Sequence, residues 1–200
     1  MNKFIFLASQ SPRRAQLLNM LGVEFELLLA DASEDAESLE VVLKNEVPRA
    51  YVQRVTGLKL DAALARMKKR ELPPAPVICS DTTVALGRVI YGKPESDADA
   101  VRMLNDLQGH THRVLTAVAI QSGKTRVQAL SVSKVTFATM SLKQIKAYVA
   151  SGEPMGKAGA YAIQGRAAAY VSHISGSYSG IMGLPMHETA LLLAELKVIR

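Results

Sequence analysis

The first residues describe a strand that passes directly into a helix. Residues 4–8 are apolar and have the pattern of a buried strand. Pro12 suits the first turn of a helix, because the N–H that proline lacks would be unpaired there anyway. Ser11 precedes it as a candidate N-cap, and Gly22 follows the apolar helical spacing where a left-handed stop is expected. The sequence therefore predicts a helix that begins near Pro12.

The start of this helix is also a candidate anion site. The free N–H groups and the positive dipole end of a helix attract anions. Arg13 and Arg14 supply guanidinium groups that can bind phosphate oxygens through two hydrogen bonds, and Ser9 and Ser11 add further donors. The alternative is a solvated, capped helix start without a ligand.

Composition limits the class of protein. The 200 residues fit one domain or two closely packed lobes, and 48% apolar with 21% charged residues is usual for a globular protein. Cys79 is the only cysteine, so no internal disulfide can form, which fits a reducing compartment. Arg13 and Arg14 come too soon for a secretory signal or a membrane span. We expect a cytoplasmic protein whose residues 1–200 form one domain.

The charge of the chain favours anionic partners. The net charge is +6, but the densest basic run, residues 67–70, closes a predicted helix, where cations complement the dipole. Aromatic residues make up only 5% and are not interleaved with basic ones, which disfavours a stacking surface for nucleic acid. We therefore do not expect a nucleic-acid partner.

Helices and strands are mixed along the rest of the chain. Pro48 opens a long helix, and three prolines within residues 73–76 interrupt regular structure before a short apolar strand at 77–79. Strands and helices do not alternate strictly, which favours an α/β fold with a mixed central sheet and flanking helices. Further strands are predicted at 25–29, 114–120, 126–137 and 168–174, and further helices at 97–107, 141–150 and 186–196.

Two carboxylates are candidates for catalysis and metal binding. Asp81 follows the strand at 77–79, so we expect it at the carboxyl end of that strand, where open α/β sheets bind ligands. Its alternative role is a turn cap. Glu34 lies in an acidic stretch with Asp31, Asp35, Glu37 and Glu40, and with Asp81 it would suit a magnesium ion. The alternative for Glu34 is a solvated acidic loop.

Two lysines complete a possible phosphate site. Lys59 lies on the helix after Pro48, and Lys93 lies in a Gly-Lys-Pro turn. Single lysines are usually surface charges. Together with two arginines and two carboxylates, they can clamp a triphosphate, carry its metal ion and activate water. His110 and His112 have the spacing of two ligands on one strand face, but without a third ligand a zinc site is not expected.

A glycine-rich segment at 156–165 has two interpretations. It is either a simple turn and strand, or a place where the backbone approaches a ligand and Gln164 offers its amide to a base edge. The segment 176–185 has the same ambiguity.

Five motifs together resemble the Maf family of nucleoside triphosphate pyrophosphatases. They occur in the order of the family and span nearly the whole chain. The motifs are Ser9-Gln10-Ser11-Pro12-Arg13-Arg14, Ser80-Asp81-Thr82-Thr83-Val84, Gly92-Lys93-Pro94, Lys157-Ala158-Gly159-Ala160-Tyr161 with Ile163-Gln164-Gly165, and Gly176-Ser177-Tyr178-Ser179 with Gly183-Leu184-Pro185.

The resemblance implies an enzyme that cleaves between the α- and β-phosphates, with magnesium, manganese or cobalt as a divalent cation. It implies two lobes around a nucleotide cleft, as in inosine triphosphate pyrophosphatases, and a possible homodimer. The catalytic positions of the family match Asp81, Lys59 and Lys93, and its acidic metal position matches Glu34 beside Asp81. The positions implied for substrate binding are Ser9, Ser11, Arg13, Arg14, Thr82 and Gln164.

Three positions indicate a subgroup. Arg13, Thr82 and Gln164 resemble the members that act on dTTP and UTP, with modified pyrimidine nucleotides as possible further substrates. The sister group that acts on 7-methyl-GTP differs at all three positions. Two alternatives remain open: a pyrophosphatase for non-canonical purine nucleotides such as ITP, and a nucleic-acid-binding or septum-related regulatory protein.

Overall fold

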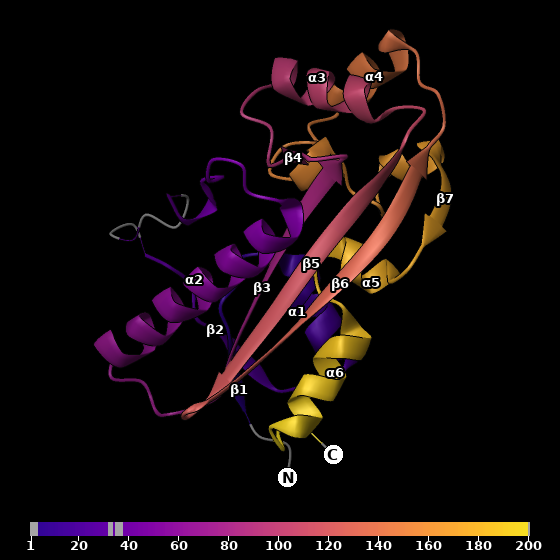
Figure 1. Ribbon diagram of the computed structural model, residues 1–200. Coiled ribbons are helices and arrows are strands. Elements are labelled where there is room, and N and C mark those ends of the chain that lie inside the picture. The colour runs from indigo at the N-terminus through magenta and orange to yellow at the C-terminus, as the bar shows by residue number, and fades with distance from the viewer. Residues whose placement is uncertain (1–3, 32–33, 35–37, 200) are drawn as a thin grey trace.

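A mixed sheet runs through the centre of the molecule (Figure 1). The computed structural model describes residues 4–31, 34 and 38–199. Within these residues the sheet has seven strands in the order β2-β1-β3-β5-β6-β7, with β4 paired to β3. β2, β1 and β3 are parallel, and all other pairs are antiparallel. The strands are β1 (Ile5–Leu7), β2 (Phe25–Leu27), β3 (Val77–Leu86), β4 (Val89–Tyr91), β5 (Thr111–Ser122), β6 (Thr125–Phe137) and β7 (Val171–Ser175).

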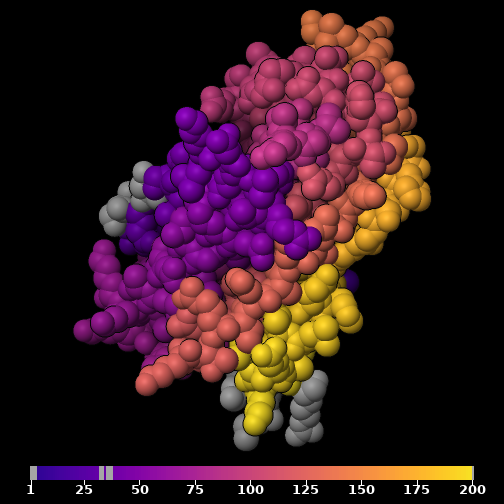
Figure 2. Space-filling view, viewed as in Figure 1, coloured from indigo at the N-terminus to yellow at the C-terminus, as the bar shows by residue number. Residues whose placement is uncertain are grey.

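Helices cover both faces of the sheet. The long helix α2 (Pro48–Lys69) lies across one face, and its surface dominates the view in Figure 2. The other face is covered by α1 (Pro12–Met20), α5 (Tyr178–Met182) and α6 (Met186–Glu195). α3 (Asp97–Leu107) and α4 (Leu142–Val149) pack together at one end of the sheet. The predicted mixed α/β fold is therefore confirmed.

Apolar residues pack against the sheet at its two ends and also beneath α2. Around α3 and α4, the core includes Leu104, Phe137 and Tyr148, and near α1 and α6 it includes Leu18 and Leu193. Burial of these side chains stabilises the two ends, since each fully buried side chain contributes roughly 2 kcal/mol. No helix among the described residues has the length and apolar character that crossing a membrane requires.

The start of α1 agrees with the sequence in position but not in bonding. Ser11 occupies the N-cap with an extended backbone, and Gly22 adopts a positive φ of 67° after the helix. The Ser11 side chain makes no cap hydrogen bond; instead its backbone N–H donates to Ser9 Oγ at 3.2 Å. The turn before the helix is thus fixed by Ser9.

The strand that carries Asp81 is longer than predicted. β3 runs to Leu86, so Asp81 lies within the strand rather than at its carboxyl end. The parallel pairing with β1 ends at Leu7 and Ile78, while antiparallel pairing with β5 continues past Asp81. β1 therefore stops before Asp81, and pairing with β5 extends β3 beyond it. The short apolar run at 77–79 does not reveal this second partner.

The remaining differences are small. The predicted strand at 168–174 begins as a 3₁₀-helix, Arg166–Tyr170, and only then becomes β7. The helix at 97–107 has the predicted bounds, and β5 and β6 form the predicted hairpin around Gly123. Asp35 and Glu37 of the acidic stretch lie outside the described residues.

Candidate active site

One cavity brings together every site residue that the sequence predicts. Its volume is about 1050 Å³, which is in the range of pockets that take a small organic ligand. It is lined by segments that lie far apart in the sequence, from the loop before α1 to the loop after α5. The predicted residues on its wall are Ser9, Ser11, Arg13, Arg14, Glu34, Lys59, Asp81, Thr82, Lys93 and Gln164.

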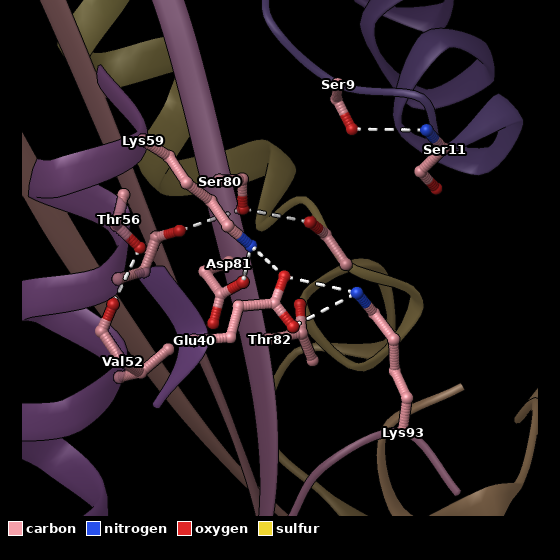
Figure 3. Close-up of polar contacts among 12 residues, drawn as sticks. Ser9, Ser11, Glu40, Val52, Thr56, Lys59, Ser80, Asp81, Thr82 and Lys93 are labelled. Atoms are coloured by element: carbon pink, nitrogen blue, oxygen red, sulfur yellow. Dashed lines mark hydrogen bonds and ion pairs between the residues drawn. The ribbon is translucent and has the colours of Figure 1, made fainter. Parts of the chain in front are cut away.

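Lys59 and Asp81 form the central ion pair of this cavity. Lys59 Nζ lies 2.5 Å from Asp81 Oδ1 (Figure 3). Asp81 is only 6% exposed, because it lies within the central strand β3. Burial alone lowers the pKa of Lys59, but the Asp81 and Glu40 carboxylates outweigh burial and raise it above its usual value. Lys59 therefore stays an ammonium ion beside the buried carboxylate.

Glu40 is a second carboxylate in the same cluster, and the sequence did not single it out as a site residue. Its Oε1 lies 2.7 Å from Lys59 Nζ, and both its oxygens lie within 3.1 Å of Lys93 Nζ (Figure 3). Burial raises the pKa of Glu40, but the two lysines have the larger combined effect and lower it. Its place in the acidic stretch was the available signal, which did not distinguish it from its neighbours.

Glu34, the predicted partner of Asp81, binds elsewhere on the cavity wall. Its two carboxylate oxygens accept hydrogen bonds from Arg66 Nε at 2.7 Å and Nη2 at 2.6 Å. Arg66 also donates to the carbonyl of Leu28 at 2.8 Å, which fixes the guanidinium. The structure thus places Glu40, and not Glu34, on the same lysine as Asp81. The role of Glu34 as a metal ligand stays a prediction.

Arg14 is held in place by three contacts. Its Nε donates to the carbonyl of Gly183 at 2.8 Å, Nη1 to Ser9 Oγ at 3.2 Å and Nη2 to Thr82 Oγ1 at 3.4 Å. Burial lowers the pKa of Arg14 and the Asp81 carboxylate opposes this shift, but a guanidinium remains a cation at any physiological pH. Arg13 Nε donates similarly to the carbonyl of Met182 at 3.3 Å. Both arginines are therefore positioned by the backbone of the α5–α6 junction.

Hydroxyl groups of β3 and β5 fix the surroundings of Thr82. Thr116 Oγ1, which is almost fully buried, lies 3.0 Å from Thr82 Oγ1 and 2.7 Å from the carbonyl of Gly180. Ser80 Oγ bonds the carbonyls of Ala117 and Gly183 at 2.8 and 2.9 Å. These bonds tie β3 to β5 and to the α5–α6 junction, so the position of Thr82 follows from the sheet.

The donor set fits a magnesium ion shared with a substrate. Among the described residues, no group of three or more His, Cys, Asp or Glu side chains could hold a metal ion by itself. Asp81 and Glu40 both contact Lys59, so two carboxylates face one point of the cavity. Magnesium uses one or two carboxylates together with water and phosphate oxygens. These residues therefore fit an ion that a phosphorylated ligand helps to hold.

The two spaced histidines do not share a site. His110 is exposed, and its Nδ1 lies 2.8 Å from the carbonyl of Gln108. His112 is buried, and its Nε2 lies 2.9 Å from Tyr161 Oη. Tyr161 lines the cavity, so His112 supports the wall and does not reach the ligand space.

The chain is similar to a known protein family and to individual known proteins. Residues 4–196 match the family described as Maf-like protein. A dTTP/UTP pyrophosphatase of Albidiferax ferrireducens is 69% identical over 193 residues, with 96% of each chain covered. A dTTP/UTP pyrophosphatase of Polaromonas sp. is 67% identical, covering 95% of this chain and 94% of the relative. The Staphylococcus aureus Ham1 protein matches with a TM-score of 0.45 and 16% identity, over 68% of this chain and 72% of that chain.

Proposed function

Because the chain belongs to the Maf family, we propose that it is a nucleoside triphosphate pyrophosphatase that hydrolyses dTTP and UTP. The products would be the nucleoside monophosphate and pyrophosphate. The main support is that Asp81, Lys59 and Arg14 line one cavity of sufficient size for a nucleotide. The two relatives that are 69% and 67% identical to this chain are both named dTTP/UTP pyrophosphatase.

Positive side chains would first neutralise the triphosphate. A triphosphate carries several negative charges, which repel an attacking hydroxide. Arg13 and Arg14 are held rigidly by backbone carbonyls, so their remaining N–H groups are available without reorganisation. Lys93 is half exposed and can turn from Glu40 toward a phosphate. Fixed cations of this kind stabilise the charge that develops in phosphoryl-transfer transition states.

Asp81 would act on the attacking water. Its buried carboxylate can accept a proton as the water attacks the α-phosphorus, and Lys59 holds the carboxylate in one orientation. The bond from the α-phosphorus to the bridging oxygen breaks, and the electrons leave with pyrophosphate. Asp81 then returns the proton to solvent.

Asp81 and Glu40 would also hold a divalent cation on the phosphates. When bound, such an ion neutralises phosphate charge and lowers the pKa of coordinated water. Glu34 remains a candidate ligand by its family position, and it would have to leave Arg66 to serve.

Pyrimidine selection would rest on Arg13, Thr82 and Gln164. The Gln164 side chain is exposed to the cavity and makes no hydrogen bond among the described residues. A free amide offers both a donor and an acceptor, which matches the edge of uracil or thymine. A cytoplasmic location is also proposed, since Cys79 is the only cysteine, so no internal disulfide can form, which fits a reducing compartment.

Product analysis tests this function. The purified chain is incubated with dTTP, UTP, dCTP, ITP and 7-methyl-GTP, each with magnesium, manganese or cobalt, and the products are separated. The proposal expects monophosphate and pyrophosphate in equal amounts, fastest from dTTP and UTP. Release of orthophosphate and a diphosphate, or a clear preference for ITP, would contradict it.

A further inference from the structure

Gln164 lies on a β-turn whose two ends are fixed separately. The N–H of Gly165 donates to the carbonyl of Ala162 at 3.0 Å, which closes the turn around Ile163 and Gln164. The amide of Gln164 can recognise a base edge reproducibly only if this turn stays in place, because the side chain itself has no hydrogen-bonding partner among the described residues. The bonds at both ends of the turn therefore bear on recognition.

One carboxylate connects both ends of this turn. Glu153 Oε2 accepts the N–H of Arg166 at 3.0 Å, and Glu153 Oε1 accepts the hydroxyl of Tyr148 at 2.9 Å. Tyr148 Oη in turn accepts the N–H of Ala162 at 3.4 Å. The backbone is thus held two residues before and two residues after Gln164. Hydrogen bonds to a charged carboxylate are stronger than those between neutral groups.

Tyr148 gives this carboxylate a rigid support. It is 5% exposed and packs in the core around α3 and α4. The helix that carries it begins with a capping box between Ser141 and Gln144. Burial, together with the Glu153 carboxylate, raises the pKa of Tyr148, so the hydroxyl keeps the proton that it donates.

Gly165 lets the carboxylate come close to the turn. A Cβ built on Gly165 would overlap the Glu153 carboxylate group. The φ of Gly165 is −103°, which any residue adopts, so space and not backbone conformation requires glycine here. The close approach accompanies the hydrogen bond that the same carboxylate accepts from the next residue, Arg166.

We propose that Glu153 and Tyr148 form a clamp that positions the Gln164 turn and thereby sets the preference of the enzyme for thymine and uracil over cytosine. Both are positioning residues, since neither of them lines the cavity in the described structure. The part of this proposal that concerns nucleobases rests on the proposed pyrophosphatase function. The part that concerns the turn does not depend on any substrate.

Three variants weaken the clamp in different ways. Glu153→Ala removes the carboxylate, Tyr148→Phe removes one hydroxyl, and Gly165→Ala pushes the carboxylate away with a methyl group. Glu195→Ala, on the exposed end of α6, is the matched control. The measured quantity is kcat/KM for dTTP divided by kcat/KM for dCTP, with a melting temperature for each variant.

We expect Glu153→Ala and Gly165→Ala to lower this ratio about tenfold and Tyr148→Phe less, with kcat for dTTP within about threefold of the wild type. If the clamp had a purely structural role, the variants would lower kcat/KM for all nucleotides equally. We also expect the double variant Glu153→Ala/Gly165→Ala to be no worse than Glu153→Ala alone, because the methyl group then fills space that the carboxylate has left. An unchanged ratio in folded variants, or additive losses in the double variant, would overturn the proposal.

Amide hydrogen exchange separates the two parts of the proposal. The amides of Ala162 and Arg166 should exchange at least about tenfold faster in Glu153→Ala than in Glu195→Ala, without any nucleotide present. Unchanged exchange would overturn the clamp itself, even if the wild type prefers dTTP. A wild type without nucleotide preference would contradict the proposed function and the recognition role, while faster exchange would still support the clamp.

Discussion

Lys59 Nζ contacts Asp81 Oδ1 at 2.5 Å and Glu40 Oε1 at 2.7 Å, so one ammonium group joins two carboxylates from different parts of the chain. Asp81 belongs to the central strand, and Glu40 to a 3₁₀ turn, Ser38–Glu40, ahead of α2. Without Lys59, Asp81 would lose this ammonium partner, and Glu40 would keep its contact with Lys93. The lysine therefore fixes how the two carboxylates are arranged in the cavity.

Removing the ammonium group should disable the site. We expect Lys59→Met to lower kcat/KM for dTTP on the order of a hundredfold, because the carboxylates lose the cation that orients them and offsets their charge. Lys59→Arg keeps the charge and should lose less. Steady-state kinetics with both variants checks this, and turnover of Lys59→Met within about threefold of the wild type would count against it.

Arginine at position 14 should not be replaceable by lysine. Arg14 uses three nitrogens on three partners, and an ammonium group cannot reproduce this fixed fork. We expect Arg14→Lys to raise KM for dTTP at least about tenfold. Arg88→Lys, at an exposed position in the turn between β3 and β4, is the control and should leave KM unchanged. Equal KM values for the two variants would show that charge alone suffices.

Changing the amide of Gln164 should change the preferred base in a defined direction. A carboxylate accepts hydrogen bonds but does not donate, so Gln164→Glu loses the donor for the O4 of thymine and gains an acceptor for the amino group of cytosine. We expect the ratio of dTTP to dCTP activity to fall about tenfold. Since Gln164 is exposed, the melting temperature should stay the same. An unaltered nucleotide profile would argue against base recognition by Gln164.

Acid should destabilise the fold through His112. Burial lowers the pKa of His112 from 6.5 to about 4. The unfolded chain therefore binds a proton between these values that the folded chain does not, so stability falls as pH decreases from 6.5 toward 4. Between pH 7 and pH 5, this difference in proton binding lowers the free energy of unfolding by about 2 kcal/mol.

Urea unfolding at the two pH values checks this dependence. His112→Gln removes the titrating group while keeping a polar partner for Tyr161. Between pH 7 and pH 5, the free energy of unfolding should therefore fall by about 2 kcal/mol less in this variant than in the wild type. If the free energy of unfolding fell equally in the two proteins between pH 7 and pH 5, His112 would not have a lowered pKa.

Local signals in the sequence predicted much of the fold. The Pro12 and Pro48 helix starts are correct, and so is the helix ended before Gly109. These features depend on contacts between neighbours in the sequence. The length of β3 does not, because its second half is paired only with the later strands β4 and β5. Asp81 was therefore expected at a strand end, although it lies within the strand.

The site was predicted by residue type but not in its pairings. The motifs indicated Asp81 and Lys93, and the family resemblance indicated Lys59; the structure brings all three into one cavity. Choosing between Glu34 and Glu40 requires knowing that Arg66, about two turns after Lys59 on α2, reaches Glu34. Side chains seven positions apart lie on one helix face, so two acids of one loop meet two different cations. Spacing within the acidic stretch alone does not contain this information.

Turnover by Asp81→Asn tests the central claim most directly. Asparagine has nearly the same shape as aspartate but neither accepts the proton of the attacking water nor carries the charge that a metal ion requires. With dTTP and magnesium, we expect the variant to keep the melting temperature of the wild type within a few degrees and to lose on the order of a hundredfold or more in kcat. A folded Asp81→Asn protein that releases pyrophosphate at nearly the wild-type rate would contradict the account.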